Sequence, residues 1–421
     1  MAKRLGIIGG GQLGMMITEA AKNLSEHISE ITVLDPTENC PAAQAGAKQI
    51  VGDFKDELAI LKLAEQSDII TYEIESGNTD VLSKLKAKIE PSPSTLGIIQ
   101  DKFSQKTFLS ENELPVSQFY EITSLGDLHE KIKELGLPVL LKLRRDAYDG
   151  RGNFKITSSD EIEKAYHHFD GKSLMVEKFV NFKMEVSVIA SRNTKGDIAT
   201  YPLVENIHEN NILKMTIAPA RVSDDVIKDA GEIARKTMEV LKGAGVFGVE
   251  MFIDQDDKIL INEIAPRVHN SGHHTLQSCK TSQFEQHIRA ILGLKLGNTD
   301  LIHKTVMCNI LGPDGFEGKY KPLKSNAELM DRIGPMSWAE SSGWSTSSIN
   351  LYEHHMILSG SNTSTGTKIS IYLKMYGKDI SKPQRKIGHF NVVDLNDSKG
   401  MSELLKTANE IKNSILINPL D

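Results

Sequence analysis

Two acidic residues, Glu250 and Glu263, stand in apolar segments that are typical of neighbouring β-strands. If the chain turns tightly at Asp256 and Asp257, the two glutamates lie opposite each other across the strands. Adjacent carboxylates repel each other unless a cation neutralises them, and Mg²⁺ that also binds phosphate oxygens fits this arrangement. The pair therefore predicts a magnesium site. The simpler alternative is an edge hairpin with two solvated acids.

The segment directly after the second strand, Arg267-Val-His-Asn-Ser-Gly-His-His274, adds an arginine and an imidazole beside the predicted metal. Its histidines lack the i, i+4 spacing of a helical zinc site and the accompanying carboxylate pattern. The segment therefore does not indicate zinc.

Basic residues form two further patterns. The glycine turn at 148–152 follows a strand-like run that carries Lys142 and ends in two arginines, so it could cover a polyphosphate. Near the C-terminus, Lys378 and Arg385 stand at a strand end and a turn, where they are suited to a phosphate monoester. Taken singly, the first could be a surface hairpin and the second a solvated basic face.

A glycine motif, Gly9, Gly11 and Gly14, lies between a strand-like and a helix-like segment. With Asp35 about twenty residues further on, it matches a dinucleotide fingerprint, which raises the alternative of an NAD-dependent oxidoreductase. Glycines at such a turn only let the backbone and a helix N-terminus approach a phosphate or another strand closely. The NAD hypothesis also leaves the acidic hairpin pair and the basic C-terminal turn unexplained.

The elements that must position these residues alternate along the chain. Up to about Pro91, apolar runs alternate with helix-like stretches, which is typical of a parallel sheet. Beyond it the pattern favours an α+β unit. Its predicted elements are a strand at 138–143, strands between 173 and 204, an amphipathic helix at 224–242 and a hairpin at 246–264, followed by C-terminal strands and a helix at 401–415.

Composition narrows the class of protein. A chain of 421 residues exceeds what one core usually organises, so we expect two or three domains. The formal charge of −7 offers no electrostatic footprint for a nucleic acid or an anionic membrane. No segment approaches the roughly 20 apolar residues of a membrane span. Three widely spaced cysteines and the absence of a signal-like N-terminal segment favour free thiols in the cytoplasm.

Four strings of residues together resemble one family of enzymes. They are Tyr-Asp-Gly-Arg-Gly at 148–152, Glu-Lys-Phe-Val at 177–180, Glu-Asn-Ile-His at 205–208 and Asn-Glu-Ile-Ala-Pro-Arg-Val-His-Asn-Ser-Gly-His at 262–273. With them the chain resembles the N5-carboxyaminoimidazole ribonucleotide synthetase family of ATP-grasp enzymes. The last string argues against other ATP-grasp ligases, such as biotin carboxylase or the formate-using phosphoribosylglycinamide formyltransferase.

The resemblance implies a multidomain α/β and α+β architecture. This is an ATP-grasp fold with an N-terminal Rossmann-like (preATP-grasp) parallel sheet and a small β-rich C-terminal domain. The implied domains are 1–99, 100–300 with a lid at about 115–180, and 301–421 with an insertion at about 317–367.

The implied reaction is the ATP-dependent carboxylation of 5-aminoimidazole ribonucleotide by bicarbonate, through carboxyphosphate, in de novo purine biosynthesis. Its products would be N5-carboxyaminoimidazole ribonucleotide, ADP and phosphate. The resemblance further implies ATP and Mg²⁺ as cofactors and a cytoplasmic homodimer. A catalytically inactive regulator is the non-enzymatic alternative, but none of the expected acids or bases is missing.

The same resemblance assigns the site residues by position. The metal ligands would be Glu250 and Glu263. The nucleotide would be bound by Lys102, Lys142, Tyr148, Asp149, Gly150, Arg151, Gly152, Glu177, Lys178, Phe179, Val180, Glu185, His208, Asn262 and Glu263. The ribonucleotide would be bound by Glu73, Glu75, Tyr148, Lys378 and Arg385. The catalytic residues would be Arg267, His269 and Asn270 on the bicarbonate side, with Asp149 and Arg151 of the loop.

Two positions depart from the family's pattern. Asp146-Ala147 replaces a common Gly-Gly before the glycine loop, and alanine disfavours the positive φ that glycine permits. Lys102 replaces a common arginine, which exchanges a bidentate fork for a point charge. Both changes bear on nucleotide affinity and not on the class of reaction.

Overall fold

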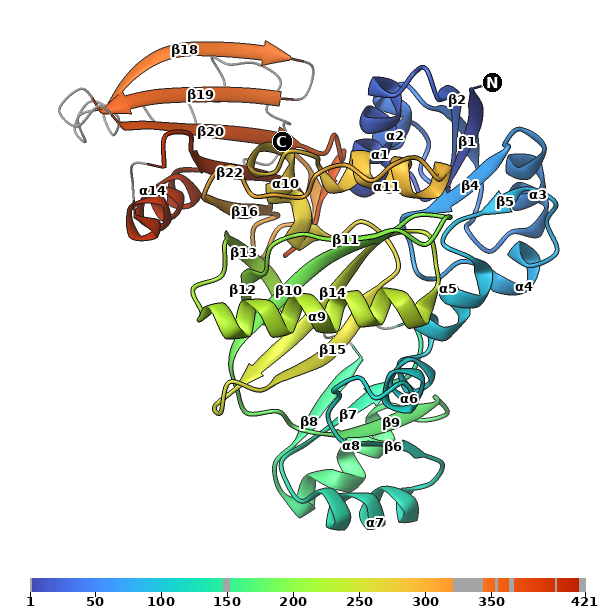
Figure 1. Cartoon of the computed structure of the whole chain (residues 1–421). Coiled ribbons are helices and arrows are strands. Elements are labelled where there is room, and N and C mark those ends of the chain that lie inside the picture. Colours follow the sequence, from blue (N-terminus) through green and yellow to red (C-terminus); the bar gives the residue numbers. More distant parts are fainter. Residues whose placement is uncertain are drawn as a thin grey trace.

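The structure is a computed structural model that describes residues 2–146, 152–320, 344–352, 355–362, 367–397 and 400–415. It contains an N-terminal parallel sheet, a small projecting lobe, and a long sheet that runs from the middle of the chain to its C-terminal strands (Figure 1). Among the helices of the described residues, none combines the length and apolar character needed to cross a membrane.

The N-terminal sheet is parallel, as predicted, with the strand order β3-β2-β1-β4-β5. Its strands are β1 (Lys3–Ile8), β2 (Ile28–Asp35), β3 (Lys48–Val51), β4 (Ile69–Tyr72) and β5 (Lys88–Ile89). Its helices are α1 (Gln12–Asn23), α2 (Pro41–Gln44), α3 (Glu57–Glu65), α4 (Thr79–Leu82) and α5 (Pro93–Gln100). Strand β4 is buried along its whole length, as expected of a parallel strand that is covered on both faces.

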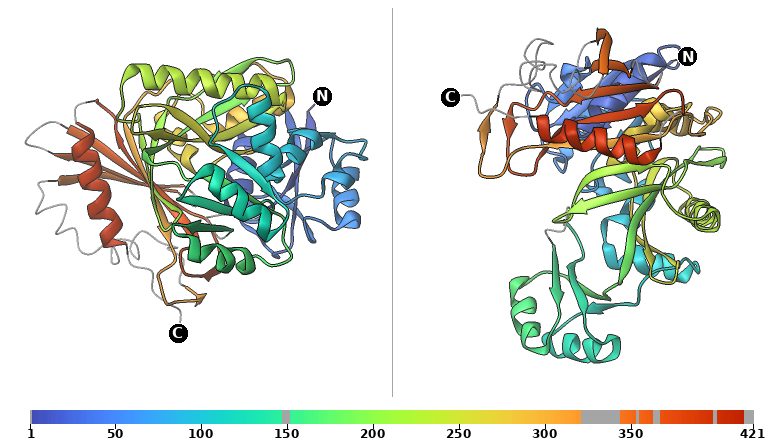
Figure 2. Two further views of the ribbon diagram at one scale, coloured as in Figure 1. Left: turned by 90° about the horizontal axis from the view of Figure 1, so that it is seen from below. Right: turned by 90° about the vertical axis from the view of Figure 1, so that its left-hand side faces the viewer.

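The small lobe is an antiparallel sheet with helices beside it, and it projects from the rest of the molecule (Figure 2). Its strand order is β6-β9-β7-β8. The strands are β6 (Phe119–Ile122), β7 (Val139–Leu143), β8 (Asn153–Ile156) and β9 (Leu174–Lys178). The helical elements are α6 (Lys102–Glu111), α7 (Leu125–Leu135), η1 (Ser159–Glu161) and α8 (Ile162–His168).

The long sheet has the strand order β15-β14-β10-β12-β13-β16-β22-β20-β19-β18, with β11 paired to β10. Its middle strands are β10 (Phe182–Arg192), β11 (Ile198–Thr200), β12 (Val204–Glu209), β13 (Ile212–Ala218), β14 (Gly245–Asp254) and β15 (Ile259–Ala265). Its C-terminal strands are β16 (Thr305–Leu311), β18 (Trp344–Tyr352), β19 (His355–Asn362), β20 (Thr367–Met375) and β22 (Lys386–Asp394). The predicted β-rich C-terminal region is therefore present, and its strands continue the middle sheet through the β13–β16 pairing.

Helices cover this sheet and join it to the N-terminal region. They are α9 (Asp224–Leu241), η2 (Asn270–His274), α10 (Thr275–Ser278), α11 (Gln283–Leu292) and α14 (Met401–Ser414). A separate small sheet is formed by β17 (Gly318–Lys319) and β21 (Ile380–Ser381). Helix α9 confirms the predicted amphipathic helix, and its apolar face packs on β10, β14 and β15 (Figure 1). Side chains of α1, α11 and β14 share one buried core, so the N-terminal and middle regions are packed together.

Candidate active site

Glu250 and Glu263 face each other across β14 and β15, as the sequence predicts. The turn between them differs from the prediction. Ile253 pairs with Ile259, so the turn is centred on Asp256 alone, and it is wider than a tight turn at Asp256 and Asp257. A β-bulge directly after Glu250 then shifts the register by one residue and restores the pairing of the two glutamates.

The wider turn is held by Asp254. One oxygen of its carboxylate accepts hydrogen bonds from the N–H groups of Asp256 and Lys258, both at 2.9 Å. Asp257 adopts a φ of 64°, in the left-handed region that Asp tolerates better than most residues. These local bonds stabilise the longer turn in place of the predicted two-residue one.

Each of the paired glutamates also has a basic partner. Lys102, at the start of α6, makes an ion pair with Glu263, and Nε2 of His269 lies 2.9 Å from Oε1 of Glu250. Burial opposes ionisation of Glu250, but its contact with His269 outweighs burial and lowers the pKa of the carboxyl group. Burial likewise works against the charge of Lys102, and Glu263 more than offsets it, so the pKa of this lysine is raised.

Helix α6 carries Lys102 to this place through its N-terminal cap. The carboxylate of Asp101 accepts hydrogen bonds from the N–H groups of Phe103 and Ser104 and pairs with Arg144. Lys106 lies four residues after Lys102, on the same face of the helix. The helix therefore presents two lysines to the acidic groups of the site.

Lys106 and Lys142 share one buried carboxylate, that of Glu177. Nζ of Lys106 lies 3.0 Å from one oxygen of Glu177, and Lys142 makes an ion pair with the other. The hydroxyl of Ser117 donates a third contact to Glu177 at 3.1 Å. Burial disfavours the charged carboxylate, but the two lysines outweigh it and lower the pKa of Glu177 to about 2.

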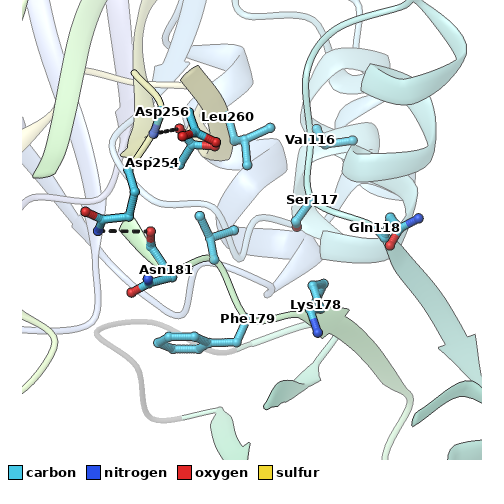
Figure 3. A pocket seen from close by; sticks show the side chains of 11 residues that line it. Val116, Ser117, Gln118, Lys178, Phe179, Asn181, Asp254, Asp256 and Leu260 are labelled. Carbon is cyan, nitrogen blue, oxygen red and sulfur yellow. Dashed lines mark hydrogen bonds between the residues drawn. The ribbon is translucent and has the colours of Figure 1, made fainter. Parts of the chain in front are cut away.

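The residues after Glu177 line a cavity of about 420 Å³ between the small lobe and the β14–β15 turn (Figure 3). Lys178, Phe179 and Val180, the residues that the family resemblance assigns to a nucleotide hinge, are among its lining residues. The other lining residues are Val116, Ser117, Gln118, Asn181, Asp254, Gln255, Asp256 and Leu260. The cavity thus combines apolar surface with hinge backbone, which suits a flat heterocycle.

Glu185 on β10 and His208 on β12 form another pair of an acidic and a basic side chain. Nδ1 of His208 lies 2.5 Å from the carboxylate of Glu185. Burial lowers the pKa of His208, but the bond to Glu185 more than compensates, and the net pKa is raised. Asn262 lies on β15, directly before the magnesium candidate Glu263. These residues do not line the hinge cavity.

The predicted bicarbonate residues divide into two kinds. Arg267 pairs with Glu75 at 2.8 Å, and His269 contacts both Glu250 and the hydroxyl of Ser271. Asn270 is buried, and its amide exchanges two hydrogen bonds with the amide of Asn309 on β16. Arg267 and His269 therefore pair with acidic side chains, Glu75 and Glu250, whereas Asn270 fastens η2 to the long sheet.

The basic C-terminal residues lie against the N-terminal region. Lys378 is bonded to the side-chain oxygen of Gln12, at the start of α1, and donates to the carbonyl of Lys386 at 2.8 Å. Burial, with a smaller contribution from the charge of Arg385, lowers the pKa of Lys378 to about 7. Arg385 itself is more exposed and donates to the carbonyl of Ile380.

Comparison with known proteins decides between the ligase and the oxidoreductase hypotheses. Residues 1–100 match the ribonucleotide synthetase preATP-grasp domain, and residues 107–284 match the ATP-grasp domain. Residues 359–402 match the phosphoribosylaminoimidazole carboxylase C-terminal domain. The chain is 42% identical over 312 residues to the N5-carboxyaminoimidazole ribonucleotide synthase of Bacillus subtilis, covering 74% of this chain and 81% of the relative. The chain belongs to the N5-carboxyaminoimidazole ribonucleotide synthase family.

Other relatives of the family agree over most of the chain. The phosphoribosylaminoimidazole carboxylase of Ogataea methanolica is 37% identical, covering 100% of this chain and 71% of the relative. The crystal structure of the N5-carboxyaminoimidazole ribonucleotide synthetase from Thermotoga maritima has a TM-score of 0.79 and 38% identity, covering 99% of each chain. The Aspergillus clavatus enzyme in complex with ADP and 5-aminoimidazole ribonucleotide has a TM-score of 0.80 and 32% identity, covering 98% of this chain and 99% of the other.

As a member of this synthase family, the chain is an ATP-grasp ligase that forms N5-carboxyaminoimidazole ribonucleotide in purine biosynthesis. The fold expectations of an ATP-grasp domain with an N-terminal preATP-grasp sheet are confirmed. The alternatives of an NAD-dependent oxidoreductase and of a different ATP-grasp ligase are thereby set aside.

The glycine motif has a structural role in this synthase. Glu73 occupies the N-terminus of α1, where its carboxylate accepts hydrogen bonds from the N–H groups of Gly11 and Gly14. Asp35 accepts a hydrogen bond from the N–H of Gly10 at 2.8 Å. The groups that would hold a dinucleotide pyrophosphate and ribose are therefore bonded within the chain.

Part of the predicted nucleotide loop, Tyr148, Asp149, Gly150 and Arg151, lies outside the described residues, as does most of the insertion predicted at about 317–367. At the edge of the loop, Asp146 adopts a φ of 56°. An aspartate therefore takes up the left-handed conformation at a position where the family commonly has glycine, and Asp is among the residues that tolerate it.

Several site residues were not predicted from the sequence. Lys106, Ser117, Asn181 and the turn 254–256 contact the site, and so does Gln12 through Lys378. The i, i+4 spacing of Lys102 and Lys106 on a helix was the one local signal that could have revealed Lys106. The others depend on contacts between distant segments.

Proposed function

We propose that this ligase carboxylates the amine of 5-aminoimidazole ribonucleotide with bicarbonate, through carboxyphosphate, at the site built around Glu250 and Glu263. The single observation that supports it most is the strand pairing of these glutamates, continued within a few residues by Arg267 and His269. Acidic groups for a metal thus adjoin basic groups for an anion. The Aspergillus clavatus relative, which binds ADP and 5-aminoimidazole ribonucleotide, supports the choice of substrates.

For the nucleotide, we propose that the adenine enters the hinge cavity and meets the backbone of Lys178, Phe179 and Val180. Lys142 would contact the phosphates, and Glu185 with His208 and Asn262 would lie on the ribose side. Lys102 and the loop formed by Tyr148, Asp149, Gly150, Arg151 and Gly152 would complete the phosphate site. Asp149 and Arg151 would also act on the transferring phosphoryl group from the closed loop.

Mg²⁺ would be held by Glu250 and Glu263, which fit it because both offer carboxylate oxygens at one place. Within the described ranges, no cluster of three or more His, Cys, Asp and Glu residues has a metal-binding arrangement. Phosphate oxygens and water would complete the coordination, since Mg²⁺ is usually bound by one or two carboxylates together with substrate phosphates. When bound, the ion would neutralise charge on the phosphates. Until then, Lys102 and His269 balance the two carboxylates.

In the proposed reaction, an oxygen of bicarbonate attacks the γ-phosphorus of ATP, the bond to the bridging oxygen breaks, and ADP leaves. Arg267, oriented by Glu75, would hold bicarbonate in line for this attack. The carboxyl carbon of carboxyphosphate, or CO₂ released from it, is then captured by the substrate amine, which loses a proton as phosphate departs. The departing phosphate would accept this proton, while His269 would stay paired with Glu250 on the bicarbonate side and Asn270 would keep η2 in place.

For the ribonucleotide, Lys378 and Arg385 would bind the phosphate monoester, and Glu73, Glu75 and Tyr148 would face the imidazole side. Gln12 holds Lys378 from the N-terminal region, so the substrate would sit where that region meets the long sheet. We further propose domains at 1–99, 100–300 and 301–421 and a homodimer. The three buried free cysteines, Cys40, Cys279 and Cys308, fit a reducing cytoplasm.

The decisive experiment follows one oxygen atom. Bicarbonate labelled with ¹⁸O is incubated with the enzyme, ATP, Mg²⁺ and 5-aminoimidazole ribonucleotide, and the released phosphate is examined by mass spectrometry at early times. One labelled oxygen in each phosphate is expected, because carboxyphosphate carries it across. Phosphate without label would refute carboxyphosphate, and ATP cleavage that does not respond to the ribonucleotide would refute the proposed acceptor.

A further inference from the structure

Lys106 is a buried lysine for which the proposed mechanism has no use. It lies on α6, is 4% exposed, and directs Nζ to Glu177 at 3.0 Å and to the hydroxyl of Ser117 at 3.2 Å. Its position is not among the nucleotide-binding residues that the family resemblance supplies. A lysine is rarely buried without a reason, because dehydrating its charge costs free energy.

A simple ion pair would not need Lys106. Glu177 already has Lys142 as a partner, and one lysine balances one carboxylate. The addition of Lys106 gives a group of two positive charges and one negative charge, all with side chains less than 8% exposed. The group therefore carries a net charge of +1 in a buried place, which is costly unless an anion comes to meet it.

The position of this group indicates which anion that is. Glu177 directly precedes the hinge residues Lys178, Phe179 and Val180, which line the cavity, and Ser117, whose hydroxyl contacts Glu177, lines it as well. Lys142 lies on β7, which leads to the glycine loop. A nucleotide with its base in the cavity would direct its phosphates toward this group.

We propose that Lys106 is a positioning residue that keeps the Lys142–Glu177 pair net positive, so that the ammonium of Lys142 is shared between Glu177 and the nucleotide phosphates. Without Lys106, the remaining pair is neutral, and Glu177 holds the whole charge of Lys142. The polyphosphate then meets a Lys142 whose positive charge is already neutralised by Glu177. The inference rests on the proposed contact of Lys142 with the phosphates.

The test separates charge from packing. Lys106→Gln keeps a side chain that can donate a hydrogen bond to Glu177 but removes the charge. We expect the KM for ATP to rise at least about tenfold, while the KM for the ribonucleotide stays within about twofold. Lys106→Met is the second variant, and thermal unfolding of both reports whether the fold is retained.

A charge-restoring double variant makes the test specific. In Lys106→Gln with Glu177→Gln, Lys142 alone remains, and the group again carries +1. We expect this double variant to bind ATP at least about fivefold more tightly than Lys106→Gln, because the electrostatic attraction is recovered. A double variant that is as weak as the single variant, or weaker, would overturn the inference, since a purely structural Lys106 predicts accumulating damage.

Two controls separate the possible failures. Lys374→Met removes another buried, ion-paired lysine, which joins β20 to Glu19 of α1, and should lower stability without changing the KM for ATP. Lys142→Met should weaken ATP binding more than any Lys106 variant. If Lys142→Met has no effect, the proposed phosphate contact fails and the inference fails with it. If Lys142→Met acts and Lys106→Gln does not, only the role of Lys106 is refuted.

Discussion

The glycine turn after β1 and the group formed by Lys106, Lys142 and Glu177 both contain groups that can bind anions. Only the second has more positive than negative charges. At the glycine turn, the N–H groups of Gly11 and Gly14 are bonded to Glu73. At the hinge, two lysines surround one carboxylate next to a cavity. A motif that suits a phosphate thus indicates a ligand site only where the chain leaves its charges uncompensated.

The glycine turn also differs from the lysine group in the part of the chain that it contacts. The glycine turn is joined to the C-terminal strands through Gln12 and Lys378, and Gln44 of α2 donates to the carbonyl of Gly377 at 3.0 Å. The former dinucleotide candidate therefore shapes one wall of the proposed ribonucleotide site. Gly14 of this motif serves close packing, because a Cβ at this position would lie 2.4 Å from the carbonyl oxygen of Gly9.

The largest effect is expected from Glu263→Gln. Replacing a proposed metal ligand that also pairs with Lys102 should reduce Mg²⁺-dependent ATP cleavage by at least about 100-fold, a loss typical of removing one electrostatic group from an active site. Phosphate release measures it. Glu232→Gln, on the exposed face of α9, is the matched control and should retain activity. Full activity in Glu263→Gln would remove Glu263 from the metal site.

A pH profile tests the phosphate site at Lys378. Because burial lowers the pKa of Lys378 to about 7, the free enzyme loses this ammonium as the pH rises through that value. The ratio kcat/KM for the ribonucleotide should therefore be highest below pH 7 and fall about tenfold by pH 8 relative to its plateau. The groups that set this pKa are Arg385 and Lys386, which lower it, and Glu73, which raises it.

Lys378→Arg provides the control for that profile. Arginine stays protonated over the whole range, so its kcat/KM should be flat between pH 7 and pH 8 even if its value is lower. A wild-type profile without this decline, or an arginine variant that keeps it, would assign the titration to another group.

The sequence predicted the pairing of neighbouring strands better than the contacts between distant elements. The pairing of Glu250 with Glu263 was predicted, because alternating side chains and an apolar face restrict the register of a hairpin. The predicted two-residue turn was wrong, because the turn is one residue wider and a β-bulge after Glu250 restores the pairing. Neither feature has a clear signature in the residues of this hairpin.

Contacts between segments that are remote in the sequence could not be predicted from local residue patterns. The pairing of Lys106 with Glu177 depends on how α6 packs against β9, and that of Gln12 with Lys378 joins the two ends of the chain. The hinge residues Lys178, Phe179 and Val180 were assigned through family resemblance, and they line the cavity. Their roles in binding remain predictions, as do those of the other proposed site residues.

A smaller effect is expected from Glu73→Ala, which sharpens the contrast at the glycine turn. Removing the carboxylate leaves the N–H groups of Gly11 and Gly14 without their partner and should cost about 1–3 kcal/mol of unfolding free energy. Denaturant unfolding measures this loss. The KM for ATP should stay unchanged, because the nucleotide is proposed to bind at the hinge. A rise in the KM for the ribonucleotide is expected as well, because Glu73 is proposed to face the imidazole side of the substrate. An unchanged KM for the ribonucleotide would restrict Glu73 to its structural role.

The smallest effect is expected at the rim of the cavity. Gln255 is exposed, and its amide donates only a 3.3 Å hydrogen bond to the carbonyl of Asn181. If the adenine is recognised by the hinge backbone and the phosphates by the lysine group, the rim contributes shape and little energy. Gln255→Ala should then change the KM for ATP by about twofold or less, the range of ordinary surface substitutions. A tenfold change would place the β14–β15 turn within the nucleotide-recognition surface, and the contrast between charged and uncharged parts of the site would have to be redrawn.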